Sequence, residues 1–336
     1  MLARLHFVCL AIALVCTLLG SAVRGQSPSG AKKIRVGIIG LDTSHVTAFT
    51  GAVKNPKGDP DLESIDIVAA FPGGSPDLPT SADRVAGFTE KLKAMGVEIV
   101  PSIEALVERV DAVLLESVDG RPHLEQVRPV IAAKKPVFID KPVAASLADA
   151  IEIYRLAEQA GVPCFSSSSL RFSPEIAGMR DNPKVGKVVG VEVHSPCSLD
   201  SHHPDLFWYG IHGVEMVYTI MGPGCVSVQR THTDGVDVVT GVWKDGRVAT
   251  YRGLRAGKTG YGGWVFGDQG IEPIGKYAGY NPLLVQIARF FRSGKPPVAA
   301  AETIELIAFM EAADESKRQG GCPVTIESVM AKASSA

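Results

Sequence analysis

Short strand-like apolar runs alternate with amphipathic segments through the first half of the chain. The runs cover residues 34–39, 65–71, 97–100, 112–115 and 137–139. One helical segment between them starts at the cap-type residue Ser102, and another extends from Leu147 to Ala160, where Gly161 is expected to end it. Regular alternation of strands and helices is typical of a parallel, doubly wound sheet. We therefore predict an α/β, Rossmann-like domain over residues 34–165.

From Gly186 the pattern changes to apolar and polar residues in alternation. Strand-like segments of this kind cover residues 188–193, 225–229, 238–243 and 247–251, and the turn pair Asp245-Gly246 lies between the last two. Helical segments are expected at 211–221, 282–292 and 303–318. The pattern predicts a second, α+β domain over residues 166–336, with an open, mainly antiparallel sheet and helices.

The beginning of the chain has the pattern of a cleavable secretory signal. An apolar run from Phe7 to Leu19 follows two basic side chains and precedes small residues. We expect a signal peptide over residues 1–25, a polar linker over 26–33, and Sec-type export to the periplasm or the extracellular space, because no arginine pair precedes the run. No later segment is long and apolar enough to span a membrane, so no membrane partner is expected after cleavage.

Composition narrows the class of partner. The chain has 336 residues, 46% of them hydrophobic, and a formal net charge of −2. This balance lacks the basic excess of a nucleic-acid-binding protein, so we expect a small neutral or acidic ligand instead. Outside the predicted signal, four cysteines are widely spaced, without metal-type spacing. A Cys197–Cys225 disulfide is one interpretation, and isolated buried thiols are the favoured one.

Five short blocks occur in an order that resembles the Gfo/Idh/MocA family of oxidoreductases. They are Gly37-Ile38-Ile39-Gly40, residues 118–123, Asp140-Lys141-Pro142, residues 170–174 and Gly210-Ile211-His212. The resemblance covers about residues 33–326. It implies a Rossmann domain that holds NAD or NADP, a substrate domain whose open sheet builds homo-oligomers, and hydride transfer at a hydroxyl of a sugar or cyclitol.

The resemblance also implies positions for the cofactor. They follow the first, fourth and fifth strands, where an open α/β sheet binds its ligands. The expected cofactor-binding residues are Gly37, Gly40, Leu41, Asp42, Thr43, Ser44, Ser117, Asp119, His123, Asp140 and Lys141.

Four positions depart from the family pattern; Asp42, the missing ribose carboxylate and Glu116 make NAD or NADP binding doubtful, and Trp208 leaves the expected proton-handling pair incomplete. Asp42 stands where the second glycine of the phosphate turn is expected, and its carboxylate would either repel phosphate or cap the following helix through the N–H of Ser44 or His45. No carboxylate follows the second strand to bind a ribose. Trp208 replaces the aspartate expected four residues before His212, and Glu116 adds a second carboxylate beside the nicotinamide path.

Candidate catalytic residues are Lys141 and His212. A partly buried lysine at a strand end can polarise a hydroxyl or carbonyl oxygen, and an imidazole can act as a general base. Pro142 fixes the backbone after Lys141. An exposed lysine and a packed histidine are the structural alternatives. For substrate binding the candidates are Arg171, His202, His203, Asp205, Trp208 and Tyr209, and no metal site is expected.

Three functions remain open at this point. The first is an exported NAD(P)-dependent oxidoreductase acting on a carbohydrate-like alcohol. The second retains the nicotinamide but returns the hydride, so that the net reaction is hydrolysis or elimination of a glycoside. The third is a cofactor-free carbohydrate-binding protein that keeps only the fold.

Overall fold

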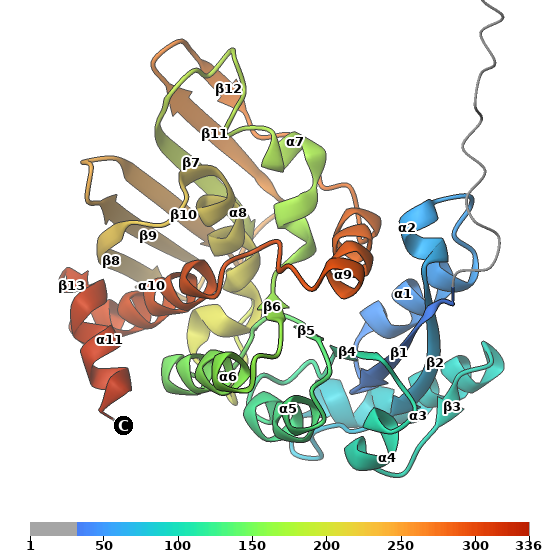
Figure 1. Cartoon of the computed structure of the whole chain (residues 1–336). Coiled ribbons are helices and arrows are strands. Elements are labelled where there is room, and N and C mark those ends of the chain that lie inside the picture. The colour runs from blue at the N-terminus through green and yellow to red at the C-terminus, as the bar shows by residue number, and fades with distance from the viewer. Residues whose placement is uncertain (1–31, 336) are drawn as a thin grey trace, which may run out of the picture. The chain divides into compact units, whose positions relative to one another are not determined.

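The computed structural model describes residues 32–335, of which the residues from Lys33 onward form one compact unit (Figure 1). The predicted signal peptide and most of the predicted linker lie outside the described residues. Within residues 32–335, no helix combines the length and the apolar character needed to cross a membrane.

The first sheet has six parallel strands in the order β3-β2-β1-β4-β5-β6, which confirms the predicted doubly wound sheet. The strands are β1 (Ile34–Ile39), β2 (Ile65–Phe71), β3 (Glu98–Ile99), β4 (Ala112–Leu115), β5 (Val137–Ile139) and β6 (Cys164–Ser166). Chain order reverses between β1 and β4, so the carboxyl ends of these two strands flank the crevice in which such sheets bind ligands.

Helices connect these strands, and local sequence sets their ends. They are α1 (Ser44–Lys54), α2 (Pro60–Glu63), α3 (Pro79–Ala94), α4 (Ile103–Val107), α5 (His123–Ala132) and α6 (Leu147–Ala160). The Ser146 hydroxyl accepts a hydrogen bond from the N–H of Asp149 at the start of α6, and Gly161 ends that helix with a φ of 63°. The end of α6 at Gly161 was predicted from the sequence, whereas the cap at Ser146 was not.

The second sheet has seven strands in the order β12-β11-β7-β10-β9-β8-β13. It is antiparallel except for the β7–β10 pair, as predicted for a mainly antiparallel sheet. The strands are β7 (Val188–Pro196), β8 (Cys225–Thr233), β9 (Val236–Trp243), β10 (Val248–Leu254), β11 (Gly262–Gly267), β12 (Ile271–Pro273) and β13 (Val324–Thr325).

Helix α8 (Ile211–Met221) packs against β7 and β10 and is buried along its whole length. Large apolar side chains at alternating strand positions remain exposed, among them Val226, Val242 and Trp264. The remaining elements are a 3₁₀ turn (Ser169–Phe172), α7 (Pro174–Ala177), a π-helical turn (Leu206–Gly210), α9 (Asn281–Ser293), α10 (Ala300–Arg318) and α11 (Ile326–Ser334). Cys197 and Cys225 are unpaired, so the favoured interpretation of free thiols is confirmed.

Helix α9 belongs to the core of the first sheet, although it follows the second sheet in the chain (Figure 1). The Phe290 ring packs edge-on against Phe165 of β6 with 4.9 Å between ring centroids. Arg289 and Arg292 donate hydrogen bonds to Asp61 of α2. The residue that precedes this helix, Tyr280, is thereby placed against His45 of α1.

Candidate active site

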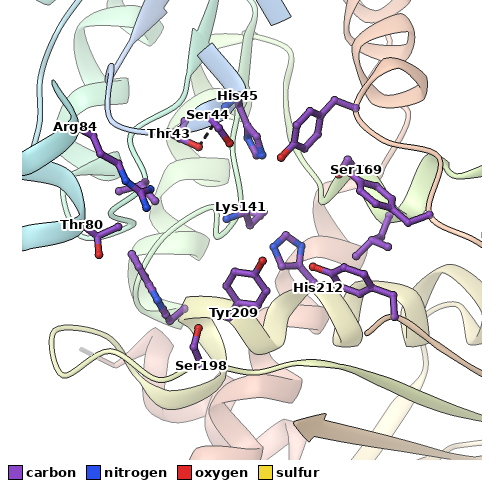
Figure 2. A pocket seen from close by; sticks show the side chains of 16 residues that line it. Thr43, Ser44, His45, Thr80, Arg84, Lys141, Ser169, Ser198, Tyr209 and His212 are labelled. Carbon is purple, nitrogen blue, oxygen red and sulfur yellow. Dashed lines mark hydrogen bonds between the residues drawn. The ribbon is translucent and has the colours of Figure 1, made fainter. Parts of the chain in front are cut away.

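A cavity of about 550 Å³ lies at the carboxyl ends of β1, β4, β5 and β6 (Figure 2). This is the edge of the sheet at which the sequence placed the chemistry. Among the described residues that line the cavity, none is acidic. They are Thr43, Ser44, His45, Thr80, Arg84, Val118, Lys141, Ser169, Leu170, Ser198, Trp208, Tyr209, His212, Tyr261, Tyr277 and Tyr280.

Lys141 and His212 both face this cavity (Figure 2). Lys141 follows β5, is only 9% exposed, and is joined to Pro142 by a cis peptide bond. His212 lies in the first turn of α8. Burial and, after it, the charge of Lys141 lower the pKa of His212 well below its usual value. The imidazole is therefore neutral near pH 7, and the two candidate catalytic groups lie close enough to influence each other.

The Ser168 hydroxyl is hydrogen-bonded to one ring nitrogen of His212. Ser168 Oγ lies 2.8 Å from His212 Nδ1. If the hydroxyl donates, Nε2 carries the proton and can donate to a ligand; if Nδ1–H donates, Nε2 is a free base. The ring can thus exchange a proton through either tautomer while its orientation stays fixed.

The start of helix α1 forms a polar end of the cavity. Thr43 is the N-cap residue, and its hydroxyl accepts a hydrogen bond from the N–H of His45 at 3.5 Å. Ser44 is exposed to the cavity, and Arg84 of α3 also lines it and forms no ion pair with any residue of the described range. A helix N-terminus with hydroxyl groups and a guanidinium group nearby suits the oxygens of a phosphate.

The Asp42 carboxylate points away from the cavity and is fully buried. Oδ1 accepts from the N–H of Val118 at 2.9 Å, and Oδ2 accepts from the Ser81 hydroxyl at 2.6 Å. Burial raises its pKa despite these bonds. The expectation that Asp42 caps α1 is wrong, because Thr43 takes that role. Its expected repulsion of phosphate also loses its basis, since the carboxylate links the loops after β1 and β4 to α3.

Several predicted cofactor positions pack within the protein instead of lining the cavity. Gly37 packs against Leu106, and Leu41 is fully buried in the core. Gly40 has a φ of +87°, and a Cβ there would lie 2.4 Å from the N atom of Ser117, so only glycine allows this close approach of two loops. None of these three, nor Ser117, lines the cavity.

His123 and Asp119 hold the loop that follows β4. His123 is fully buried, with Nε2 at 2.8 Å from the Ser117 carbonyl and Nδ1 at 3.2 Å from the Val143 carbonyl. Asp119 Oδ1 lies 3.0 Å from His203 Nε2, and the same carboxylate accepts hydrogen bonds from Arg121. Burial alone would raise the pKa of Asp119, but these bonds hold it well below its usual value.

The structure separates the predicted substrate residues into two groups. Trp208 and Tyr209 line the cavity, and the others do not. Arg171 is held by Glu215 and Glu302. His202 pairs with Asp200 and His203 with Asp119, whereas Asp205 binds Arg230 and Lys317. Arg171 therefore makes ion pairs within the protein, as expected if it has a structural role and does not bind substrate.

Sequence reasoning missed the aromatic wall and a buried cluster beside it. Tyr261, Tyr277 and Tyr280 come from a glycine-rich segment with no periodic pattern. His45 is packed against the Tyr280 ring at 4.6 Å between centroids, and its Nδ1 lies 3.0 Å from Asp140 Oδ2 and 3.5 Å from Glu116 Oε2. The unusual Glu116 after β4 was the available signal, but the sequence did not connect it with His45.

The charges of this cluster are strongly coupled. Burial opposes a charge on His45, yet Asp140 and Glu116 outweigh it and raise the pKa of His45 to about 10. Burial, reinforced by the charge of Asp140, raises the pKa of Glu116 to about 7. Asp140 is also buried, but His45 and Lys141 lower its pKa to about 2. Asp140, predicted to touch a cofactor, instead faces His45.

Part of the chain is similar to proteins of a known family. Residues 34–168 match the model of an oxidoreductase family described as having an NAD-binding Rossmann fold, the Gfo/Idh/MocA family. Residues 34–168 are thus similar to the Rossmann domain of this family. A 1,5-anhydro-D-fructose reductase from Ensifer adhaerens is 33% identical over 173 residues, which are 50% of this chain and 47% of the relative. The chain thus matches about half the length of this curated relative.

Solved structures share the fold at low identity. The myo-inositol dehydrogenase from Lactobacillus casei, solved with NAD(H) and myo-inositol, superposes with a TM-score of 0.69 at 17% identity, covering 88% of this chain and 97% of its own. The scyllo-inositol dehydrogenase of the same organism, solved with NAD(H) and scyllo-inositol, gives 0.72 at 14% identity, covering 88% and 100%. These similarities confirm the predicted folds of the first and the second domain.

The cavity fits part of a nicotinamide dinucleotide. The start of α1, with Thr43, Ser44 and Arg84, suits phosphate oxygens, and Asp42 is turned away from them. Residues 72–76 after β2 offer no carboxylate to a ribose, and the next residue, Asp77, is paired with Arg121. A Cβ on Gly73 would lie 3.4 Å from the Cα of Gly40, so this loop lies against the phosphate turn. The residues fit the phosphates, while the usual ribose anchor is absent from this loop.

Proposed function

We propose that this chain is an NAD(P)-dependent oxidoreductase acting on a hydroxyl group of a sugar or cyclitol. The observation that carries the proposal is the position of Lys141 and a neutral His212 in one cavity whose other end suits a phosphate. The family that residues 34–168 match and the structural neighbours of the chain support the same chemistry.

In this proposal, Thr43, Ser44, the N-terminus of α1 and Arg84 hold the dinucleotide phosphates. The nicotinamide, when bound, supplies the hydride acceptor or donor. Lys141 binds the reacting substrate oxygen and stabilises negative charge that develops on it. His212 Nε2 takes the hydroxyl proton, and Ser168 keeps the ring in place through Nδ1.

The aromatic wall sets the substrate class. Trp208 and four tyrosines line the cavity, and the C–H faces of a sugar or cyclitol can stack on such rings. Tyr209 and Tyr261 also pack around His212, with ring centroids 4.9 and 6.2 Å from it. No carboxylate among the described lining residues would select for a cation, so a neutral or anionic polyol is favoured.

Calorimetry with NAD⁺ and NADP⁺ on residues 26–336 tests the proposal, together with an assay for nucleotide released on denaturation. Binding in the micromolar range or tighter is expected. Replacing Arg84 by Gln should weaken binding about tenfold, the equivalent of one charge-assisted hydrogen bond, whereas Lys93→Gln on the same helix should not. No binding at millimolar nucleotide would reject the dinucleotide and leave the cofactor-free carbohydrate-binding alternative.

Turnover distinguishes net oxidation from the redox-neutral alternative. A net oxidoreductase releases one reduced nicotinamide per product when a polyol is oxidised. Glycoside cleavage at a constant level of reduced nicotinamide, in a protein that binds the nucleotide, would instead support transient oxidation and contradict net oxidation.

Export and assembly complete the proposal. We propose that residues 1–25 direct Sec-type export, which N-terminal sequencing of the secreted chain would test. We also propose a homo-oligomer that covers Val226, Val242 and Trp264 on the exposed face of the second sheet. Light scattering on Trp264→Glu, compared with the unaltered chain, tests this: a mass unchanged from an oligomeric parent would contradict it.

A further inference from the structure

Three potential ligand side chains come together in the interior beside the cavity. His45 Nδ1, Glu116 and Asp140 each offer a ligand atom, and these atoms all lie within 4.8 Å of one another. Glu116 is 0% exposed, Asp140 1% and His45 7%. They come from three separate places, the first turn of α1 and the ends of β4 and β5, so the fold and not a local motif brings them together.

These side chains lack the hydrogen bonds that buried polar groups need. No residue of the described range makes a hydrogen bond to either oxygen of Glu116, to either oxygen of Asp140, or to His45 Nδ1. A proton on Nδ1 could satisfy at most one of the four carboxylate oxygens. Leaving buried carboxylate oxygens without a partner is costly, and one imidazole proton does not satisfy both groups.

The distances match those between ligands of one metal ion. Two ligands at about 2.1 Å from a tetrahedral ion are roughly 3.4 Å apart, and neither points at the other as a hydrogen-bond partner does. His45 Nδ1 lies 3.0 Å from Asp140 Oδ2 and 3.5 Å from Glu116 Oε2, and neither contact is aligned as a hydrogen bond. The three groups therefore already surround a position at which an ion could be bound.

We propose that His45, Glu116 and Asp140 form a binding site for a divalent first-row transition metal, with Zn²⁺ as the favoured ion. One imidazole nitrogen and two carboxylates suit zinc, whereas magnesium prefers all-oxygen ligands. The charge of Lys141 acts on both carboxylates and opposes weakly held cations, which again favours an ion with a strong bond to nitrogen. His45 lines the cavity, so the ion is reached from it.

Of the three proposed ligands, only His45 lines the cavity, and neither Glu116 nor Asp140 is among the proposed dinucleotide contacts. The test of the metal site therefore needs no activity. The chain should be stripped of metal with a chelator and titrated with Zn²⁺ by calorimetry, with Mg²⁺ as the comparison ion. We expect one Zn²⁺ per chain, a raised melting temperature, and no saturable Mg²⁺ binding at the same concentration.

Variants locate the ion. Glu116→Gln should weaken Zn²⁺ binding on the order of a hundredfold and abolish the shift in melting temperature. It also removes a charge from a crowded buried pair, so the metal-free variant should be at least as stable as the metal-free parent. Asp42→Asn is the matched control: this carboxylate is equally buried but its oxygens are hydrogen-bonded, and Zn²⁺ binding should be retained.

Replacing Zn²⁺ by Co²⁺ gives a second, spectroscopic test of the site. A tetrahedral nitrogen–oxygen site should give visible absorption bands that disappear in Asp140→Asn, the variant to use if Glu116→Gln does not fold. Less than one equivalent of Zn²⁺ bound, or equal binding by Glu116→Gln or Asp140→Asn, would overturn the proposal. Such a result would mean that a protonated His45 alone balances the two carboxylates.

Discussion

The positive charge of Lys141 acts on His212 across one cavity, and it adds to burial in keeping that imidazole neutral. Lys141 follows β5 and His212 lies in the first turn of α8, so the interaction joins the first sheet to the helix that packs on the second. A cation that can bind an oxygen and a neutral base that can take its proton are thus placed beside each other. Substitution of either residue therefore tests the proposed chemistry directly.

Replacing Lys141 by Met should remove the group that stabilises charge on the reacting oxygen. We expect kcat to fall by about 10²–10⁴-fold on whichever polyol the chain oxidises, with little change in melting temperature. Steady-state kinetics and circular dichroism measure the two effects. A variant that keeps the parental kcat would rule out a catalytic role for Lys141.

His212 should stay neutral at pH values where an ordinary histidine is charged. Its lowered pKa means that the unfolded chain binds a proton below about pH 6.5 that the native chain does not, so stability should decline as the pH falls through this value. NMR titration of labelled histidine should show no protonation of His212 at pH 6. In Lys141→Met its pKa should rise, because a repelling charge has gone; an unchanged value would show that the two groups do not interact.

Much of the fold was accessible from the sequence because local signals agreed with it. Strands β1, β2, β4 and β5 were predicted with their observed limits, and Leu147–Ala160 and Ile211–Met221 with both ends. Short edge strands such as β13 gave no periodic signal. Strand pairing was harder to predict from the sequence than the type of each element. The parallel pairing of β7 with β10, for example, depends on how segments far apart in the sequence are placed.

The site was predictable where residues follow strands and unpredictable where tertiary packing decides. Lys141 and His212 were found because motifs mark them. His202, His203 and Asp205 were grouped as one substrate loop, but their side chains bind protein partners instead. Tyr280 reaches the cavity only because α9 packs on the first sheet, and His45 meets Glu116 only in the folded chain, so neither relationship leaves a trace in local sequence.

The buried Asp42 carboxylate should matter for stability and little for nucleotide binding. Asp42→Ala leaves the Val118 N–H and the Ser81 hydroxyl without their acceptor, at a cost of about 1–3 kcal/mol in the free energy of unfolding. Denaturant unfolding measures this loss. Asp42→Asn, which keeps one acceptor oxygen, should lose less.

The Asp42→Asn variant also tests whether Asp42 repels phosphate. If the carboxylate limited dinucleotide binding, Asp42→Asn would bind NAD⁺ roughly a hundredfold more tightly. Because the carboxylate points away from the cavity, we expect less than a threefold change, about 0.6 kcal/mol. Calorimetry on the folded variant decides between these outcomes, and a large gain in affinity would contradict the orientation described above.

Asp119 should make the chain sensitive to acid. Its hydrogen bonds with His203 and Arg121 outweigh burial and depress its pKa in the folded state, so the native chain releases this proton more readily than the unfolded chain. The stabilisation is therefore complete above the unfolded pKa of about 3.9 and is lost as the pH falls below it.

Asp119→Asn should be less stable than the parent at pH 7, and the difference in the free energy of unfolding should narrow towards pH 2. Denaturant unfolding at both pH values measures it, with Asp77→Asn, an exposed partner of the same Arg121, as a control of smaller effect. A difference that stays constant between pH 7 and pH 2 would show that the Asp119 charge does not hold the β4 loop to His203.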